Sequence, residues 1–218
     1  MYNYRTILKR VGIALIAIGI VDIAYTIYSI SQHQNHSSSF SILAVVAGVS
    51  LIRGSLRAVS IVTWVAAFGI SNFISNLFIL IPFLKPAELW EIEFRLDPVG
   101  LSMSFLVKII SIALLWWIYT QLRDPSVVSA SLKSGHSAST PKLAFILGIA
   151  LVVLLTGIMR FTVDGPAGAK AVELARSKYG DNYKYHVQGM SWSNGNVKAN
   201  VAAYNEQEIK SVQVEWNQ

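Results

Sequence analysis

The chain contains no cysteine, which excludes disulfide bonds, thiolate metal sites and thiol nucleophiles together. It also lacks a P-loop, a dinucleotide-binding fingerprint, a nucleophile elbow and a zinc-protease motif. His33 and His36 lie three residues apart in a stretch of Gln, Asn and Ser, which is typical of a solvated loop rather than of a metal site. From these absences we expect no enzymatic activity, no cofactor and no metal.

Charged residues are scarce as well, at 14% of the chain, against about 25% in soluble domains. Hydrophobic residues make up 53%, and the mean hydropathy is +0.48. The net charge of +6 would favour a nucleic-acid partner only if the basic residues gathered on one soluble face. They stand instead at the ends of apolar segments. The composition therefore predicts a membrane protein whose first partner is the lipid bilayer, with no nucleic-acid partner.

Apolar stretches long enough to cross a bilayer recur along the first three quarters of the chain. A hydrocarbon core of about 30 Å requires about 20 helical residues. The five candidate spans are 11–30, 38–55, 58–82, 99–120 and 142–161. The second is the weakest, because its uninterrupted apolar part runs only from Phe40 to Ile52, so four spans remain the alternative. We predict a mainly α-helical bundle over residues 1–163.

The distribution of Lys and Arg predicts the orientation of these spans, because positive residues are retained on the cytoplasmic side. Two of them, Lys85 and Arg95, fall in the loops predicted to lie outside. The loops and ends predicted to lie inside contain Arg5, Lys9, Arg10, Arg53, Arg57, Arg123, Lys133 and Lys142. We therefore expect a protein of the bacterial inner (cell) membrane with a cytoplasmic N-terminus and a C-terminus outside.

Four polar residues interrupt the predicted spans at similar depths, roughly 9 to 15 Å below the outer boundary by helical rise. They are Asp22, Asn72, Asn76 and Lys108. A charge at this depth costs about 2.5 to 3.5 kcal/mol, so it requires a partner or water. We predict an ion pair between Asp22 and Lys108 with both asparagines as hydrogen-bonding neighbours. This intramembrane polar cluster is either a structural clamp, which the balanced charges favour, or an ion path; Lys108 can alternatively extend toward the headgroups.

The last quarter of the chain, 164–218, has the pattern of a small α+β domain outside the membrane. Pro166 and Gly180 favour a helix over 166–179. Three strand-like runs follow: Tyr183–Trp192, Val197–Tyr204 and Glu208–Trp216, the first two joined by an Asn194–Gly195 hairpin signal. The sequence predicts one helix packed on a three-stranded antiparallel meander.

Two loops complete the predicted organisation. In the outer loop, 85–98, the apolar residues Trp90, Ile92, Phe94 and Leu96 alternate with charged ones, which favours a fourth strand docked on the meander. The inner loop, Arg123 to Lys142, is rich in Ser and poor in large apolar residues, so we expect a flexible linker. Arg160 is expected to mark the outer membrane interface.

Aromatic residues are dense in the predicted C-terminal domain, and Tyr and Trp are enriched at binding surfaces. The candidate partner-binding aromatics are Tyr183, Tyr185, Trp192, Tyr204 and Trp216. His186, the single histidine of this region, is expected to face solvent or a sheet edge.

Together these features favour a non-enzymatic multipass membrane protein that acts as an accessory, assembly or interaction subunit through its extracytoplasmic module. The expected partner is another protein or a second copy of the chain. The alternative is a small oligomeric transporter or channel subunit that uses the intramembrane polar cluster. Five spans are few for a carrier built on paired repeats, and the chain contains no internal repeat.

Overall fold

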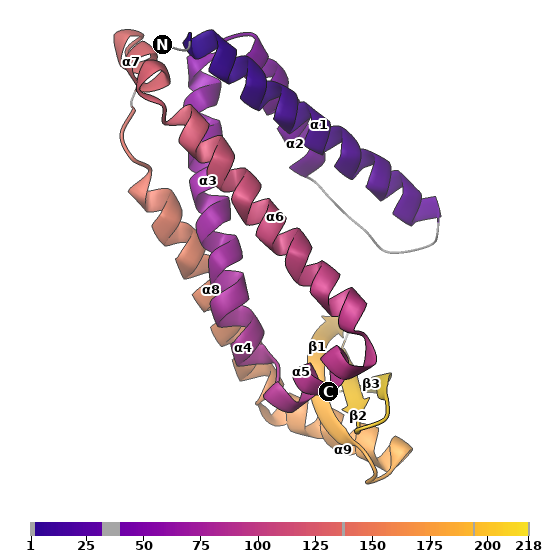
Figure 1. The fold of residues 1–218 in the computed structure, drawn as a ribbon. Helices are drawn as coiled ribbons and strands as arrows, with labels where there is room; N and C mark the ends of the chain where they lie inside the picture. Colours follow the sequence, from indigo (N-terminus) through magenta and orange to yellow (C-terminus); the bar gives the residue numbers. More distant parts are fainter. Residues whose placement is uncertain (1–2, 32–39, 137, 194, 218) are drawn as a thin grey trace. The chain divides into compact units, whose positions relative to one another are not determined.

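A computed structural model describes residues 3–31, 40–136, 138–193 and 195–217 (Figure 1). The helices are α1 (Tyr4–Ser31), α2 (Phe40–Ile52), α3 (Leu56–Ser75), the π-helix η1 (Asn76–Leu80), α4 (Ile81–Leu84), α5 (Ala87–Leu96), α6 (Pro98–Leu122), α7 (Pro125–Lys133), α8 (Lys142–Val163) and α9 (Pro166–Tyr179). The strands are β1 (Lys184–Ser193), β2 (Asn196–Tyr204) and β3 (Ile209–Asn217). The chain packs as two compact units, the first formed by 1–70 with 112–146 and the second by 71–111 with 147–218. The predicted division at 163/164 concerns the membrane and stays a prediction.

Within the described residues, four helical stretches are long and apolar enough to cross a membrane. They are Tyr4–Ser31, Leu56–Leu84, Pro98–Leu122 and Lys142–Val163. The remaining predicted span, 38–55, is represented by α2, whose 13 residues rise about 20 Å and fall short of a 30 Å core. The prediction of an integral membrane protein is therefore supported by four helices, with α2 as a shorter apolar helix beside α1.

In the first unit, α1 and α2 run antiparallel at very close range, and two glycines permit this. A Cβ atom built on Gly12 would lie 2.6 Å from the carbonyl oxygen of Gly48, and one built on Gly48 would lie 2.6 Å from that of Gly12. The neighbours repeat the same relation, since Ile52 meets Gly12 as Ile16 meets Gly48. Small residues that allow backbones to approach are the common basis of helix packing in membranes.

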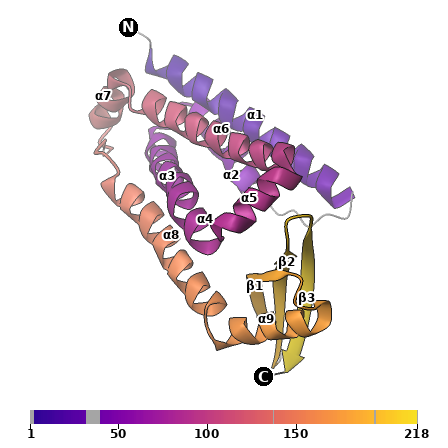
Figure 2. The same ribbon diagram turned by 60° about the horizontal axis from the view of Figure 1, so that its bottom comes forward.

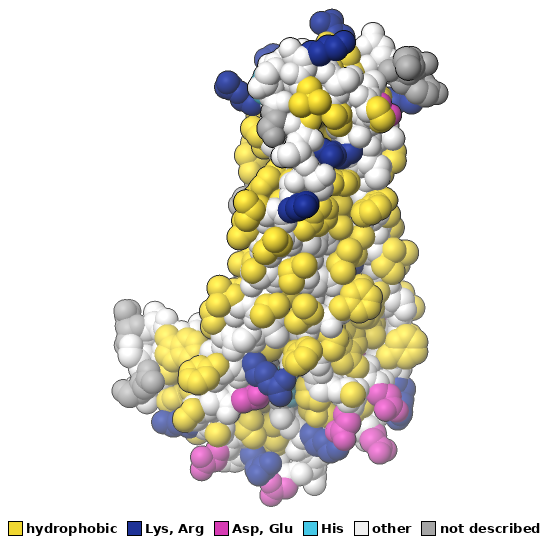
Figure 3. Space-filling view, turned by 90° about the vertical axis from the view of Figure 1, so that its left-hand side faces the viewer, with side chains coloured by type: hydrophobic (Ala, Val, Ile, Leu, Met, Phe, Trp, Pro, Cys, Tyr) yellow, Lys and Arg dark blue, Asp and Glu magenta, His cyan; other side chains and the backbone are white. Residues whose placement is uncertain are grey.

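The hydrophobic core of the first unit joins several helix ends. Leu8 near the start of α1, Leu51 at the end of α2, Val59 near the start of α3 and Leu122 at the end of α6 are all buried in one cluster with Val127 of α7. The eight basic residues predicted to lie inside belong to these same ends and their loops, or to the start of α8. In Figure 3 this end of the unit, at the top, carries dark-blue Lys and Arg side chains. The positive residues are therefore collected at one end.

The helix that starts with α3 widens into the π-helix η1 just before a proline. Pro82 has no N–H, and in a regular α-helix its ring would clash with the carbonyl of Phe78, four residues earlier. The backbone N–H of Ile81 donates instead to the carbonyl of Asn76, five residues back. We attribute the wide turn to Pro82.

The predicted flexible linker is wrong over Pro125–Lys133, where the structure has helix α7. Asp124 begins this helix, because its carboxylate accepts a hydrogen bond of 2.8 Å from the backbone N–H of Ser126, and Pro125 follows at the first helical position. Val127 is fully buried in the core of the first unit. A proper N-cap and one anchoring side chain thus order a segment whose composition suggested disorder.

The second unit confirms the predicted helix and three-stranded antiparallel sheet, in the order β1–β2–β3. Figure 2 shows α9 lying across one face of this sheet. A row of partnered valines, Val187, Val201 and Val212, forms the centre of that face, and the small residues Ala171 and Ala175 of α9 pack against it. Gly180, at φ +82°, ends the helix. Asn194 of the predicted hairpin lies outside the described residues, but β1 and β2 pair up to Ser193 and Asn196.

The predicted fourth strand from 85–98 is wrong, because this segment forms the helix α5. Its one buried residue, Leu89, packs with Ala202 and Tyr204 on the sheet face opposite α9, and Ile92 lies beside them. Leu89 and Ile92 are three residues apart, a helical rather than a strand spacing. The segment does add to the core of the C-terminal module, as expected, but through a helix face.

Candidate functional site

A pocket of about 480 Å³ lies in the second unit, where the chain leaves the apolar helices α4 and α8. Its apolar wall comes from α4 and the turn into α5, and its polar residues come from three separate segments. The lining residues are Pro82, Phe83, Leu84, Lys85, Pro86, Ala87, Arg160, Val163, Asp164 and His186. Its volume is in the range of small-molecule sites, roughly 300–1,000 Å³.

Two cations of the pocket are each held by a carboxylate. The Nε of Arg160 donates to Asp164 at 3.1 Å, one helical turn further along the chain. Lys85 forms an ion pair with Glu93 of α5, and its Nζ lies 4.4 Å from the centroid of the Trp90 ring. Lys85 and Glu93 are mostly buried, whereas Arg160 and Asp164 are more than half exposed. The pocket is therefore charged but locally balanced.

His186 enters the pocket from β1. Burial lowers the pKa of this histidine and nearby Lys85 acts in the same direction, while a backbone hydrogen bond at Leu84 and the charge of Asp164 oppose them. The pKa of the imidazole therefore lies below its ordinary value of about 6.5. His186 was expected to face solvent or a sheet edge; it lies on the edge strand β1, as the second alternative has it, and is half-buried against the α4–α5 turn.

Sequence reasoning named Lys85, Arg160 and His186 separately and did not bring them together. Lys85 follows the predicted span 58–82 and Arg160 stands at the outer end of the predicted span 142–161, so the sequence predicted only that both lie on the same side of the membrane. The sequence did not predict that β1 lies beside the end of α4, where Leu84 and His186, about one hundred positions apart, line the same pocket.

The five candidate aromatics of the C-terminal module have different surroundings. Tyr204 is 4% exposed and belongs to the core. Tyr183, Tyr185 and Trp216 are partly buried against the α9 side of the sheet, and the hydroxyl of Tyr185 donates to the carbonyl of Gly180 at 2.6 Å. Trp192 is 50% exposed. A binding role for these aromatics stays a prediction, and Trp192 is the most exposed of the five.

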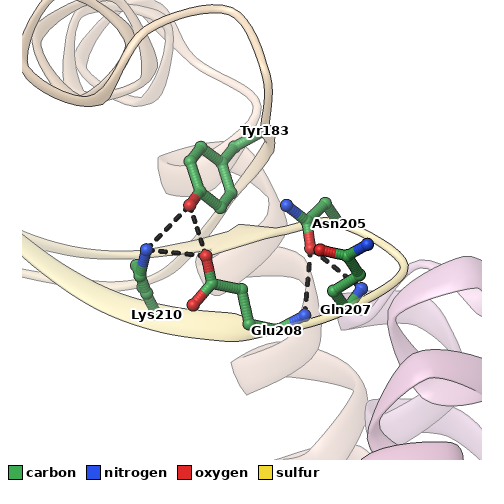
Figure 4. Close-up of polar contacts among 5 residues, drawn as sticks. All are labelled: Tyr183, Asn205, Gln207, Glu208 and Lys210. Atoms are coloured by element: carbon green, nitrogen blue, oxygen red, sulfur yellow. Dashed lines mark hydrogen bonds and ion pairs between the residues drawn. The ribbon is translucent and has the colours of Figure 1, made fainter.

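Tyr183 has a local role that accounts for its hydroxyl (Figure 4). The Nζ of Lys210 donates to the Tyr183 oxygen at 2.7 Å and to the carboxylate of Glu208 at 2.6 Å, and the Tyr183 hydroxyl donates to the same carboxylate. Lys210 chiefly, then Tyr183, hold the pKa of Glu208 below its ordinary value. Beside this cluster, Asn205 closes the β2–β3 turn by accepting the backbone N–H groups of Gln207 and Glu208, each at 2.9 Å.

The predicted intramembrane polar cluster is divided between the two units, with Asp22 in the first and the other three residues in the second. The backbone carbonyl of Asp22 accepts a 2.8 Å hydrogen bond from the hydroxyl of Thr26. Asn72 and Asn76 are half-buried one turn apart, and the Lys108 Nζ lies 5.9 Å from the ring centroid of Phe105. The ion pair of Asp22 with Lys108 stays a prediction.

His33 and His36 lie outside the described residues. Comparison of the chain with models of protein families, with curated proteins and with solved structures found no match.

Proposed function

We propose that the chain is a non-enzymatic multipass membrane protein that acts as an accessory, assembly or interaction subunit of the bacterial inner (cell) membrane. Its helices anchor it in the lipid bilayer, and its extracytoplasmic C-terminal module contacts another protein. The observation that carries this proposal is the exposed Trp192 at the end of a well-packed sheet, because a large aromatic side chain in water is a common anchor of protein interfaces.

The geometry of the sheet supports this assignment. Trp192, Val197 and Trp216 are Cα partners in one row across the three strands, so the exposed indole continues an apolar row that ends in a second tryptophan. Among the described residues, β1 and β3 each pair with β2 alone, which leaves two outer edges for a partner strand. We call the three partnered residues Trp192, Val197 and Trp216 the Trp192 row.

The basic residues collected at one end of the first unit support the proposed orientation. They gather on the first unit, whereas the acidic residues Glu88, Glu91 and Glu93 stand on α5 of the second. By the positive-inside rule the basic end of the first unit is cytoplasmic.

Single-cysteine labelling tests the orientation directly, because the chain has no cysteine of its own. We expect Ser193→Cys to react with a membrane-impermeant maleimide in intact spheroplasts. Ser134→Cys, the matched change in an exposed residue after α7, should react only after permeabilisation. If Ser134→Cys reacted in intact spheroplasts and Ser193→Cys reacted only after permeabilisation, the orientation would be the reverse of the one proposed.

The partner is tested by replacing Trp192 with the photo-crosslinking residue p-benzoylphenylalanine in the full chain. Irradiation of whole cells should give one adduct of discrete mass that contains a second, different protein. The same replacement at the buried Tyr204 is the control and should give no intermolecular adduct. An adduct of twice the chain mass would indicate a homo-oligomer and favour the transporter alternative, and an absence of adducts at Trp192 would contradict the proposed interaction.

A further inference from the structure

The pocket described above has two chemically different halves. On one side Phe83, which is 58% exposed, presents its ring at the end of the apolar helix α4, and Val163 stands at the end of the apolar helix α8. On the other side lie Lys85, Asp164 and His186. Aromatic rings at the end of an apolar helix, followed at once by charged groups, are typical of the headgroup level of a membrane.

The two cations retain hydrogen-bonding capacity for a ligand. Arg160 donates to Asp164 through Nε, and a guanidinium has five N–H donors in all. Its charge also lies 6.0 Å from the ring centroid of Phe83, so it stands at the border between the two halves. Lys85 donates to Glu93 and carries three N–H donors. Arg and Lys with spare donors are the side chains that bind phosphate most often.

The pocket also contains a negative group. Asp164 lines it beside Arg160. A ligand with a phosphate alone would meet the repulsion of this carboxylate, whereas a ligand with both a phosphate and an ammonium would satisfy both signs. A primary ammonium can donate hydrogen bonds to a carboxylate, but a quaternary ammonium cannot.

We propose that this pocket binds a phospholipid with a phosphoethanolamine headgroup. The phosphate lies between Arg160 and Lys85, the primary ammonium donates to Asp164, and the glycerol end lies along Phe83 toward the bilayer. This assignment goes beyond the proposed partner contact and does not depend on it, because the pocket and the Trp192 row share no residue.

Native mass spectrometry of the purified full chain, delipidated in mild detergent, tests the assignment. Titration with phosphatidylethanolamine, phosphatidylcholine and phosphatidylglycerol of equal chain length should show preferential binding of one phosphatidylethanolamine. Arg160→Gln should weaken that binding about tenfold, the loss expected for one charge-assisted hydrogen bond. Asp164→Asn should remove the preference for phosphatidylethanolamine over phosphatidylglycerol while leaving phosphate binding in place.

Arg95→Gln is the matched control, because Arg95 is an exposed arginine of α5 that pairs with Glu91 and does not line the pocket. It should bind lipid as the unmodified chain does. Equal loss in Arg95→Gln and Arg160→Gln would overturn the site, as would equal binding of the three lipids by the unmodified chain. Water-soluble glycerophosphoethanolamine carries the same headgroup without acyl chains. If it displaced the lipid when present at the same concentration, the ligand would be a free phosphate ester rather than a phospholipid, and the proposal would be overturned.

Discussion

Replacement of Leu89 with alanine is expected to lower the opening free energy of the C-terminal sheet by about 2–5 kcal/mol, the range for a buried Leu→Ala change. Leu89 is fully buried and contacts Ala202 and Tyr204. Ala202 has only a methyl group, so this neighbour cannot fill the cavity that the substitution leaves. Amide hydrogen exchange of β2 in the full chain measures the effect, since local opening exposes these amides to solvent.

The same change at Leu96 is the control for this prediction. Leu96 lies on the same helix but is 44% exposed, so Leu96→Ala should change the opening free energy by less than about 0.5 kcal/mol. If the segment were a strand, Leu96 and Phe94 would share its buried face and Leu89 would point away. A larger loss for Leu96→Ala than for Leu89→Ala would therefore contradict the docking of α5 through Leu89.

The error over α5 shows where pattern reasoning fails in a short amphipathic segment. Four alternating apolar residues suggested a strand, but the local signals of a helix were also present. Pro86 precedes the segment, Glu88 stands in the first turn and Arg95 in the last, and Glu91 pairs with Arg95 four residues later at 3.1 Å. Leu89 lay just outside the alternating run, so the residue that buries the helix was left out of the count.

The C-terminal module was predictable because its signals are local. The first-turn Pro166, the Gly180 cap and the Gly195 turn each define a boundary within a few residues. The pocket was not predictable in the same way. It requires His186 to lie beside Leu84, and nothing in the sequence around either residue indicates this contact. Contacts between distant segments require the packing of the whole unit, which composition and periodicity do not specify.

The close approach of α1 and α2 was also not predicted from the sequence, because Gly12 and Gly48 belong to different helices. It leads to a prediction with a large expected effect. Gly12→Ala should lower the free energy of unfolding by about 1–3 kcal/mol, the usual cost of overpacking, because its Cβ would lie 2.6 Å from a backbone oxygen that no rotamer change can move. Titration of the protein in mixed micelles with SDS, followed by circular dichroism, gives this free energy.

Gly157→Ala is the control that measures the gain in helix propensity, which any Gly→Ala change in a helix also brings. A Cβ at Gly157 of α8 would have nothing within 4 Å, so alanine there adds only its helix propensity, a gain of up to about 1 kcal/mol. The difference between Gly12→Ala and Gly157→Ala then isolates the steric cost at the helix pair. If both substitutions stabilise the protein equally, α1 and α2 are not in backbone contact.

The reciprocal geometry makes the double substitution the most decisive measurement. Gly48→Ala should cost about as much as Gly12→Ala, because each Cβ meets the other glycine's carbonyl at the same 2.6 Å. Once the first alanine has forced the helices apart, the second has less to displace, so the two costs should add to clearly more than the cost of the double variant, by about 0.5–3 kcal/mol. Strict additivity would mean that the two positions act in separate places. In that case Leu51, buried beside Leu8, would have to hold the short helix α2 by side-chain packing alone.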